Sequence, residues 1–347
     1  MKTVWCIPSN VLTNKYMYLM QMAMKKAGYK VLGPGERLKK INSAIIHLNW
    51  FENIDDDKTA QYVYYKKKFL LFLFQLSKKR IIFTMHNKQP HDKKSNHYSK
   101  KLLLKLMQIS DVIIIHSRYS MQVIEEKFQS INLKKVVYVP HPNYKYAYKD
   151  LKTYKNFSKL ESELVFGFIG QIRPYKNVEV LIQAANRFSN TKDIKFLICG
   201  KSINDDYKLK IEQMKTNQNI IFDLRFIEDN EIVSLMKQID VVILPYSTES
   251  ALNSAAAILA FTYGKTVLST NVGTVIDLKD TGDLYSYQYY SNEAKHVEIL
   301  VSKIQEIYKI FQSDHDIIKQ QGINLKNRVL TENSIEIIEN SLKKIYL

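Results

Sequence analysis

Residues 164–182 read LVFGFIGQIRPYKNVEVLI, and this stretch decides the fold. An apolar strand ends at a glycine, and a short polar turn leads from it into a helical pattern. Pro174 keeps Arg173 out of the helical conformation, because the residue before a proline is held in extended backbone. Gly170 lets another group approach the backbone closely. The stretch therefore predicts a strand, a turn that carries Arg173 and Lys176, and a helix.

The alternation of apolar strands and helical patterns continues on both sides of this stretch, in two series. The first series of predicted strands is Thr3–Ile7, Ala44–Leu48, Arg80–Met85, Asp111–His116 and Val136–Val139, and the second is Leu164–Ile169, Ile194–Cys199, Asn219–Phe222, Val241–Leu244 and Thr266–Ser269. Strands separated by helices indicate βαβ units and parallel sheets. Residues 140–160 are polar and tyrosine-rich, so they form the predicted linker. Residues 292–346 read as two or three helices.

We therefore expect an α/β protein with two parallel-sheet domains, residues 1–150 and residues 151–347, the second with a helical tail. The length agrees, because 347 residues suffice for about two domains. Open parallel sheets bind ligands at the carboxyl ends of their strands. We expect the two domains to face each other across a cleft of that kind.

Cysteine usage and hydropathy predict the compartment. Cys6 and Cys199 lie in apolar runs far apart, which predicts buried thiols in a reducing cytoplasm rather than disulfides or a zinc site. The first apolar stretch is too short for a signal peptide. The longest apolar run, Phe69 to Phe74, is far below the about 20 residues that span a bilayer.

The charge is distributed unevenly. The chain carries 51 Lys and Arg against 34 Asp and Glu, a net charge of +17, and the first 150 residues hold 27 of these cations and only 10 of the acids. A genomic bias toward lysine would raise the lysine content of both parts of the chain, whereas only the first part has an excess of cations. A basic surface attracts polyanions or anionic lipid, so we expect an anionic partner for the first part.

Several segments of the first part mix cations with bulky apolar residues. Lys66-Lys67-Lys68 precedes the run of Phe69 to Phe74, and Lys100 to Lys105 follows the same pattern. Such helices can lie on an anionic membrane surface. The alternative is that their apolar faces pack on the sheet. Core packing is the prediction for helix 58–77, and both interpretations stay open for helix 97–109.

The second part contains a candidate anion site. Arg173 offers a planar fork for phosphate oxygens and Lys176 a point charge. Residues 240–257 predict a strand, a polar loop and an alanine-rich helix that begins near Asn253 and Ser254, whose free N–H groups could bind the same anion. The alternatives are solvated cations and plain helix capping. The acidic runs at residues 55–57 and 205–206 read as solvated turns, so we expect no metal.

These two segments carry a family resemblance. GFIGQIRPYKNVEVLI, followed by DVVILPY and AAAILAFTYGKTVLSTNVGTVID, resembles the donor-binding domain of bacterial GT-B glycosyltransferases, in particular glycosyltransferase family 4 and its exopolysaccharide relatives. The likeness is strong over residues 165–277. It implies two Rossmann-like domains and a nucleoside-diphosphate sugar, of UDP or GDP, as a substrate in the second. Donor contacts implied by the resemblance are Gly170, Arg173, Lys176, Glu249, Asn253 and Ser254, with neither cofactor nor metal.

The sequence departs from the family at one point. Family 4 members carry two glutamates eight positions apart, and alignment on Gly264 puts Ala251 and Leu259 there. Glu249 could replace the first glutamate, at a spacing two residues longer. Whether the anomeric configuration is retained or inverted therefore stays open.

The first part is expected to bind the acceptor. His86 follows a predicted strand, where imidazole can take a proton or donate to a phosphate, or serve as a structural loop histidine. Glu52 could act as general base or as a helix-start charge. Trp50 could stack on a sugar ring. His141 could line the site or order the linker. Asn10 stands where relatives have a glycine-rich loop, and we expect it at the acceptor site.

Together these features predict a metal-independent hexosyltransferase, cytoplasmic and peripheral on the inner face of the plasma membrane. It would transfer sugar to a saccharide or polyprenyl-diphosphate-linked acceptor in envelope or exopolysaccharide synthesis. The alternative is a sugar-nucleotide epimerase of the same fold, which would leave the basic first part unexplained. The sequence contains no recognised nucleic-acid-binding motif, so we expect no nucleic acid as partner.

Overall fold

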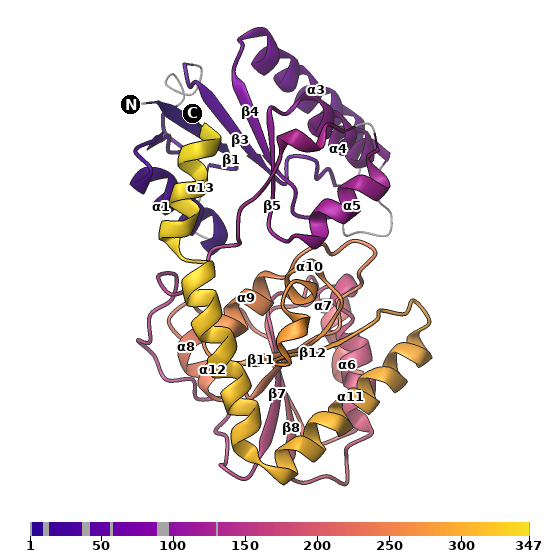
Figure 1. The fold of residues 1–347 in the computed structure, drawn as a ribbon. Coiled ribbons are helices and arrows are strands. Elements are labelled where there is room, and N and C mark those ends of the chain that lie inside the picture. The colour runs from indigo at the N-terminus through magenta and orange to yellow at the C-terminus, as the bar shows by residue number, and fades with distance from the viewer. Residues whose placement is uncertain are drawn as a thin grey trace. The chain divides into compact units, whose positions relative to one another are not determined.

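The structure, a computed structural model, describes residues 2–9, 14–36, 42–55, 58–88, 97–129 and 131–346. The chain forms two compact units: unit 1 is Met1–Pro142, Glu249–Asn253 and Glu332–Leu347, and unit 2 is Asn143–Thr248 and Ser254–Thr331. Each unit is built on its own parallel sheet of six strands (Figure 1). The predicted α/β class with two parallel sheets is confirmed.

Unit 1 has the strand order β2-β1-β3-β4-β5-β6, with every pairing parallel. The strands are β1 (Thr3–Ile7), β2 (Lys30–Val31), β3 (Ile45–Asn49), β4 (Arg80–Thr84), β5 (Val112–Ile115) and β6 (Val136–Tyr138), and the helices are α1 (Lys15–Lys26), α3 (Ala60–Leu76), α4 (His97–Ile109), α5 (Tyr119–Lys127) and α13 (Ile335–Tyr346). All residues of β3 and β5 are buried. Central strands of a parallel sheet are apolar throughout because both faces are covered.

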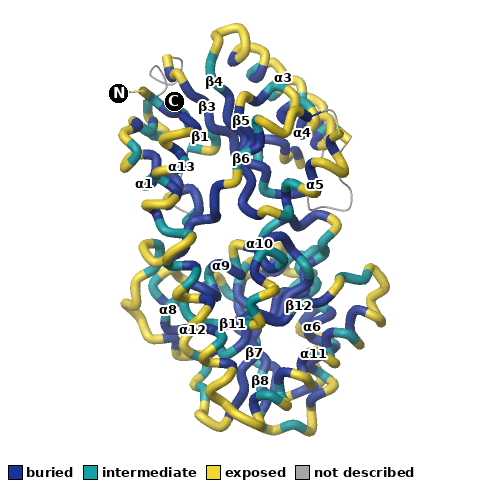
Figure 2. The backbone as a smooth tube through the Cα atoms, in the orientation of Figure 1, coloured by how far each residue is buried: buried dark blue, intermediate teal, exposed yellow. Residues whose placement is uncertain are grey.

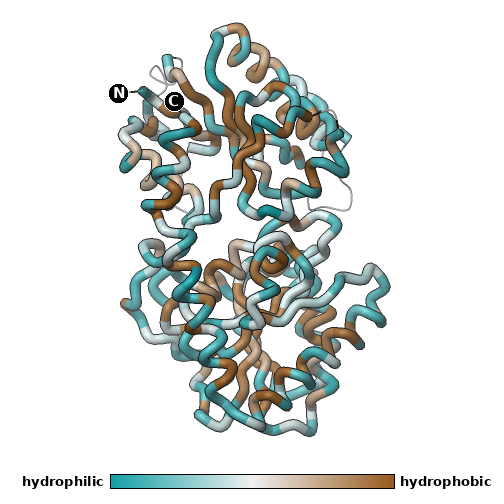
Figure 3. Tube along the Cα trace, in the orientation of Figure 1, coloured by the Kyte–Doolittle hydropathy of each residue, from teal (hydrophilic) through white to brown (hydrophobic). Residues whose placement is uncertain are grey.

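Unit 2 has the order β12-β11-β10-β7-β8-β9. The strands are β7 (Leu164–Ile169), β8 (Ile194–Cys199), β9 (Ile220–Asp223), β10 (Val241–Leu244), β11 (Thr266–Thr270) and β12 (Tyr285–Tyr287), and the helices are α6 (Val178–Asn186), α7 (Asp205–Gln213), α8 (Ile232–Lys237), α9 (Ala255–Thr262), α10 (Gly273–Ile276), α11 (Glu293–Ser313) and α12 (His315–Glu332). The central strands of both units are strongly hydrophobic in Figure 3.

All ten predicted strands are present, and no strand end differs from its prediction by more than one residue. The short edge strands β2 and β12 were not predicted. Cys6 and Cys199 are free and buried, as predicted. Across the described residues, no helix is both long enough and apolar enough to cross a bilayer.

The predicted second domain, residues 151–347, differs from unit 2 at the end of the chain. Helix α13 lies beside α1 in unit 1 (Figure 1). Its apolar face buries Ile338, Leu342 and Tyr346 completely. The position of a helix with a strong apolar face depends on the surface against which that face packs. The order of the elements in the sequence does not reveal this surface.

A second return to unit 1 occurs in the loop between β10 and α9. Leu252 is fully buried in the hydrophobic core of unit 1. Ala251 pairs with Asn87 as an antiparallel bridge, and the Lys88 N–H donates to the Ser250 carbonyl at 3.0 Å. The segment Glu249–Asn253 is therefore held by unit 1, although the strand before it and the helix after it belong to unit 2.

The prediction of core packing for residues 58–77 is correct for one face of helix α3 and wrong for the other. Only Ala60, Leu71 and Phe74 of this helix are buried. Figure 2 shows exposed residues along most of its length. Its neighbour α4 does pack on the core, through Leu102, Leu103 and Leu106 among others. The sequence could not separate these cases, because α3 carries apolar residues on two sides and only one side packs on the core.

The last helix allows a test of the fold. The Tyr346 hydroxyl lies 2.6 Å from Nδ1 of His47, and both residues are fully buried. We expect Tyr346→Phe to lower the free energy of unfolding by about 1 kcal/mol, because one buried hydrogen bond is lost. Tyr346→Ala leaves a cavity and should cost about 3–5 kcal/mol. Urea denaturation measures both values.

The control is Tyr146→Ala, because Tyr146 is 51% exposed. It should change stability by less than about 0.5 kcal/mol. Equal effects of the two alanine variants would show that α13 contributes nothing to the core of unit 1.

Candidate functional site

The turn after β7 in unit 2 is built on two glycines. Gly170 and Gly200 have φ angles of +134° and +139°, which favour glycine. A Cβ added to Gly200 would lie 2.0 Å from the Gly170 carbonyl oxygen. The Gly170 N–H donates to the Cys199 carbonyl at 3.1 Å. The backbones of the turns after β7 and β8 are therefore in direct contact. Any side chain at residue 200 would prevent this contact.

Lys176 points its ammonium group toward this turn. Its Nζ lies 3.1 Å from where a Cβ on Gly170 would be, 5.7 Å from the ring centre of Phe168 and 5.5 Å from that of Tyr246. Within the described ranges, no carboxylate forms an ion pair with it. Burial, and then the charge of Arg173, lowers the pKa of Lys176 to about 8. A desolvated cation held by aromatic rings alone is prepared for an anionic ligand.

The rest of the turn is fixed to the loop after β10. The Asn177 backbone is left-handed, with φ of 51°, and its Nδ2 donates to the Pro245 carbonyl at 2.8 Å. The Ser247 N–H donates to the Tyr175 carbonyl, also at 2.8 Å. Nε of Arg173 donates to Oε1 of Gln171 at 2.9 Å. The two sequence segments that predicted the anion site are thus brought together in unit 2.

Helix α9 begins at Ser254. The Ser254 hydroxyl caps the helix by accepting from the Ala257 N–H at 3.2 Å, and the Ser254 N–H donates to the Thr274 hydroxyl at 3.1 Å. The predicted donor contacts Glu249 and Asn253 precede this cap but belong to unit 1. Both amide atoms of the Asn253 side chain are buried without a hydrogen-bond partner. Glu249 is exposed.

In unit 1, three strands place aromatic and imidazole rings at one edge of the sheet. Trp50 follows β3, His86 follows β4 and His116 follows β5. The rings of Trp50 and His86 are stacked, with centroids 4.0 Å apart, and those of His86 and His116 lie 5.6 Å apart. Tyr16 of α1 meets His86 edge-on at 4.9 Å. We call these four rings and His141, which lies 5.2 Å from Tyr16, the ring cluster.

The histidines of the ring cluster are neutral. Burial, and then the neighbouring His116, His141 and His47, lowers the pKa of His86 well below its ordinary value. Burial also lowers the pKa of His116 to about 4 and that of His141 to about 3. Three imidazoles held this close would repel one another if they were charged. The cluster therefore offers uncharged nitrogen atoms at neutral pH.

Asn49, the last residue of β3, fixes which nitrogen of His86 carries the hydrogen. The Oδ1 of Asn49 lies 3.1 Å from Nε2 of His86. An amide oxygen only accepts hydrogen bonds, so Nε2 donates and Nδ1 keeps its lone pair. The Nδ2 of Asn49 is buried without a partner. His86 is thus prepared to accept a hydrogen bond or a proton at Nδ1.

Glu52 lies apart from these contacts. Among the described residues, no hydrogen bond or ring contact joins it to the ring cluster. Burial raises its pKa to about 7, and Oε2 has no hydrogen-bond partner. Such a carboxyl group is poised to exchange a proton near neutral pH. Its role as general base stays a prediction.

The other predicted acceptor residues have mixed outcomes. Trp50 uses one face to stack on His86, and its contact with a sugar stays a prediction. His141 lies in the ring cluster, and its Nδ1 donates to the Pro142 carbonyl at 2.9 Å. Asn10 lies outside the described residues. Tyr16, Asn49 and His116 were missed, although Asn49 and His116 end strands and could have been found by that criterion.

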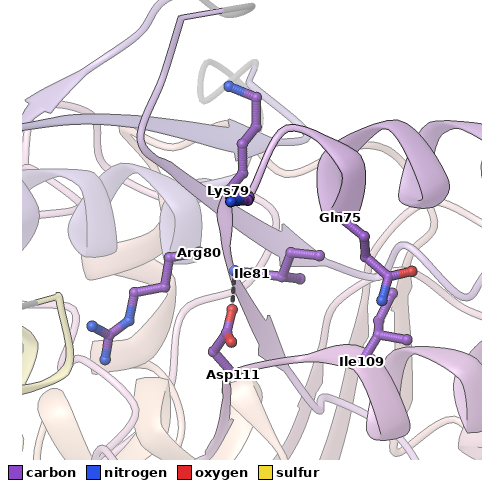
Figure 4. A pocket seen from close by; sticks show the side chains of 7 residues that line it. Gln75, Lys79, Arg80, Ile81, Ile109 and Asp111 are labelled. Atoms are coloured by element: carbon purple, nitrogen blue, oxygen red, sulfur yellow. Dashed lines mark hydrogen bonds between the residues drawn. The ribbon is translucent and has the colours of Figure 1, made fainter.

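No cluster of His, Cys, Asp and Glu in the described part of the chain could hold a metal ion. A hollow of about 540 Å³ lies at the opposite edge of the unit 1 sheet. It is lined by Lys78, Lys79, Arg80 and Asp111 among others. In Figure 4 the side chains of Lys79 and Arg80 point in different directions, and Asp111 accepts from the Ile81 N–H at 2.7 Å. These cations do not converge on one ligand.

Comparison with known proteins identifies unit 2. Residues 151–321 match the family model of Glycosyl transferases group 1, a stretch that holds β7 to β12 and the turn of Lys176. This chain is a glycosyltransferase with the GT-B fold. A comparison with curated proteins finds no match for the sequence.

Solved structures share the fold of this glycosyltransferase over its whole length. HepE from Anabaena, in complex with UDP and glucose, has a TM-score of 0.67 at 13% identity, covering 100% of this chain and 99% of that one. Sucrose-phosphate synthase from Thermosynechococcus elongatus has a TM-score of 0.72 at 12% identity, covering 100% and 98%. A glycosyltransferase from Rickettsia africae has a TM-score of 0.65 at 14% identity, covering 99% and 97%.

The half-buried Lys176 gives a prediction in which stability and binding change in opposite directions. The pKa of Lys176 is lowered from 10.5 to about 8, so the folded protein binds fewer protons between these values. Stability should rise with pH over that window, and the cost of the buried charge is fully present below pH 8. Lys176→Met should therefore stabilise the free protein at pH 7 by about 1–3 kcal/mol. It should also weaken binding of a nucleoside-diphosphate sugar by about tenfold or more.

Thermal unfolding at pH 7 and pH 10.5, with calorimetry of binding, measures these effects. The control is Lys201→Met, which removes an exposed lysine after β8. A destabilised Lys176→Met protein with unchanged sugar-nucleotide affinity would contradict the assignment.

The neutral state of His86 gives a second prediction. In ¹⁵N NMR, His86 of the wild type should stay in the Nε2–H form from pH 8 down to pH 5.5, because burial lowers its pKa. In Asn49→Asp a carboxylate would replace the amide oxygen, and the pKa of His86 should rise by about 1–3 units. A wild-type His86 that titrates near 6.5 would refute the proposed geometry.

Proposed function

We propose that this glycosyltransferase transfers a hexosyl group from a nucleoside-diphosphate sugar to a saccharide or lipid-linked acceptor in bacterial envelope or exopolysaccharide synthesis. The observation that carries the proposal is Lys176, a half-buried cation without a carboxylate partner among the described residues, on a glycine turn at the carboxyl end of a parallel sheet. Such edges bind ligands, and a diphosphate supplies the missing negative charge.

The proposed donor site combines charge and backbone. Lys176 and Arg173 contact the diphosphate, and the absence of a side chain at Gly170 lets the phosphate oxygens approach the turn. Ser254 opens helix α9, whose N–H groups and dipole favour the same anion. Glu249 and Asn253 contact the sugar. Because cations and a helix N-terminus neutralise the leaving diphosphate, we propose that no metal takes part.

UDP is the proposed nucleotide, with GDP as the alternative. HepE is described in complex with UDP-glucose, and the pneumococcal O-GlcNAc transferase GtfA in complex with UDP and GlcNAc. GtfA has a TM-score of 0.61 at 14% identity. These complexes support the choice of nucleotide and leave the sugar to experiment.

The proposed chemistry in unit 1 starts from the neutral His86. The bond from the anomeric carbon to the diphosphate breaks, the acceptor hydroxyl oxygen forms the new bond, and its proton must pass to a base. The lone pair on Nδ1 of His86 can take it, and Glu52 is the alternative base. Trp50, His141 and Asn10 are the proposed contacts of the acceptor.

The pH dependence of turnover separates the two bases. With Glu52 as base, activity should fall as pH drops through about 7, where its carboxylate is protonated. With His86 as base, the fall should come well below 6.5, because the pKa of its imidazole is lowered. Glu52→Gln should abolish the fall in activity near pH 7 if Glu52 is the base. The fall well below pH 6.5 that is expected for His86 should be unchanged in this variant.

The proposed location is the cytoplasmic face of the plasma membrane, with peripheral binding to anionic lipid. Support comes from the first 150 residues, which hold 27 Lys and Arg against 10 Asp and Glu. A polyprenyl-diphosphate-linked acceptor is presented at such a surface, and basic residues near it gain attraction from anionic headgroups.

A thermal-shift screen against UDP-, GDP-, ADP- and TDP-sugars tests the donor. At a ligand concentration a hundred times Kd, binding adds about 2.7 kcal/mol to stability, which raises Tm by several degrees. We expect UDP-glucose or UDP-GlcNAc to give this rise, and Arg173→Ala to abolish it. No rise with any of these sugars would contradict the proposal. Conversion of the donor without an acceptor would instead favour an epimerase.

A further inference from the structure

Helix α3 presents six large apolar side chains to solvent. The exposed fractions are Tyr62 69%, Tyr65 55%, Phe69 60%, Phe72 55%, Leu73 38% and Leu76 68%. Their spacing of three, four, three, one and three residues places them along one face of the helix. We call this set the α3 stripe. The opposite face, with Leu71 and Phe74, packs on the core. A contiguous apolar surface of this size marks an interaction site rather than scattered exposed residues.

The charged residues of helices α3 and α4 have a single sign. Neither α3 nor α4 contains an acidic residue. Lys66 and Lys68 of α3 are exposed, and Lys58 and Lys78 lie just beyond its two ends. The combination of aromatic side chains, aliphatic side chains and lysines is typical of helices that lie in a membrane interface.

Helix α4 extends the same surface. The rings of Tyr64 on α3 and Tyr98 on α4 lie 5.1 Å apart, which joins the two helices. Leu104 on α4 is 48% exposed, and Lys100, Lys101 and the half-buried Lys105 lie on the same helix. Basic residues on both helices can therefore approach one charged plane together.

The charges also decide between the occupants of this surface. A symmetric dimer would bring the same patch of two copies together. It would place lysines of both chains in a dry interface without acidic partners, which is unfavourable. An anionic lipid surface supplies both the apolar layer and the opposite charge.

We propose that the α3 stripe inserts into the headgroup and upper acyl region of an anionic bilayer, with the lysines of α3 and α4 on lipid phosphates. This inference rests on the peripheral location proposed above and names the surface responsible. It requires no change in the donor site of unit 2. The acceptor-binding unit would thereby be held at the surface that presents a lipid-linked acceptor.

Vesicle sedimentation of the full-length protein tests the proposal. Vesicles of phosphatidylcholine with one third phosphatidylglycerol should bind the protein, and pure phosphatidylcholine vesicles should bind it much less. Phe69→Ser with Phe72→Ser should lower the partition coefficient at least tenfold, because two buried aromatic side chains are lost. Lys66→Gln with Lys68→Gln should lower it about fivefold per lysine on anionic vesicles only.

Matched controls lie in unit 2. Leu151 and Leu160 are 74% and 61% exposed, and their double serine variant should bind vesicles like the wild type. The exposed Lys309 and Lys319, changed together to glutamine, control for the loss of two charges. Affinity for the UDP-sugar found in the screen should be unchanged in all variants, which shows that they are folded. Failure of vesicle binding alone therefore leaves the proposed donor site intact.

A direct measurement of depth completes the test. Phe69→Trp should show a blue shift of tryptophan emission on anionic vesicles and quenching by lipids brominated on the acyl chain. Equal binding of the Phe69/Phe72 variant and the wild type would overturn the proposal. So would a lipid-free dimer that the same two serines convert to monomers, because the α3 stripe would then be a self-association surface.

Discussion

The account depends on one unpaired charge. Lys176 is held between the rings of Phe168 and Tyr246, against a turn that has no side chain at Gly170. A partly desolvated ammonium group without a carboxylate costs stability, and this cost lowers the pKa of Lys176 to about 8. In the proposed function, a ligand with two phosphates supplies the missing negative charge. The free protein is thus less stable because its proposed ligand site holds an uncompensated charge.

In unit 1, by contrast, the histidines of the ring cluster are held neutral. Burial and mutual proximity lower the pKa of His86, His116 and His141, and Asn49 sets the tautomer of His86. A neutral imidazole can accept a proton from a hydroxyl group, whereas an imidazolium cannot. In the proposed function, the cations of unit 2 stabilise the leaving diphosphate, and a neutral histidine of unit 1 takes the proton of the attacking hydroxyl group.

The sequence predicted the strands well and the long-range returns of the chain poorly. Apolar runs such as Leu164–Ile169 carry their own signal, because strands of a parallel sheet are buried on both faces. Residues at strand ends, including Arg173 and His86, followed from the same reading. Tyr16 could not be found in this way, because it reaches the ring cluster from a helix. The return of α13 and Leu252 to unit 1 depends on which surface remains uncovered, and that is a property of the folded chain. The exposure of one face of α3 was not predicted for the same reason.

Proton uptake on donor binding tests the central claim most directly. A diphosphate next to Lys176 raises the pKa of its ammonium group, so binding of UDP-glucose at pH 8 should take up about half a proton, since half of the lysine is uncharged there. Calorimetry in buffers of different ionisation enthalpy gives this number. The account predicts uptake in the wild type and none in Lys176→Met. Binding without uptake in the wild type, or with equal uptake in the variant, would contradict it.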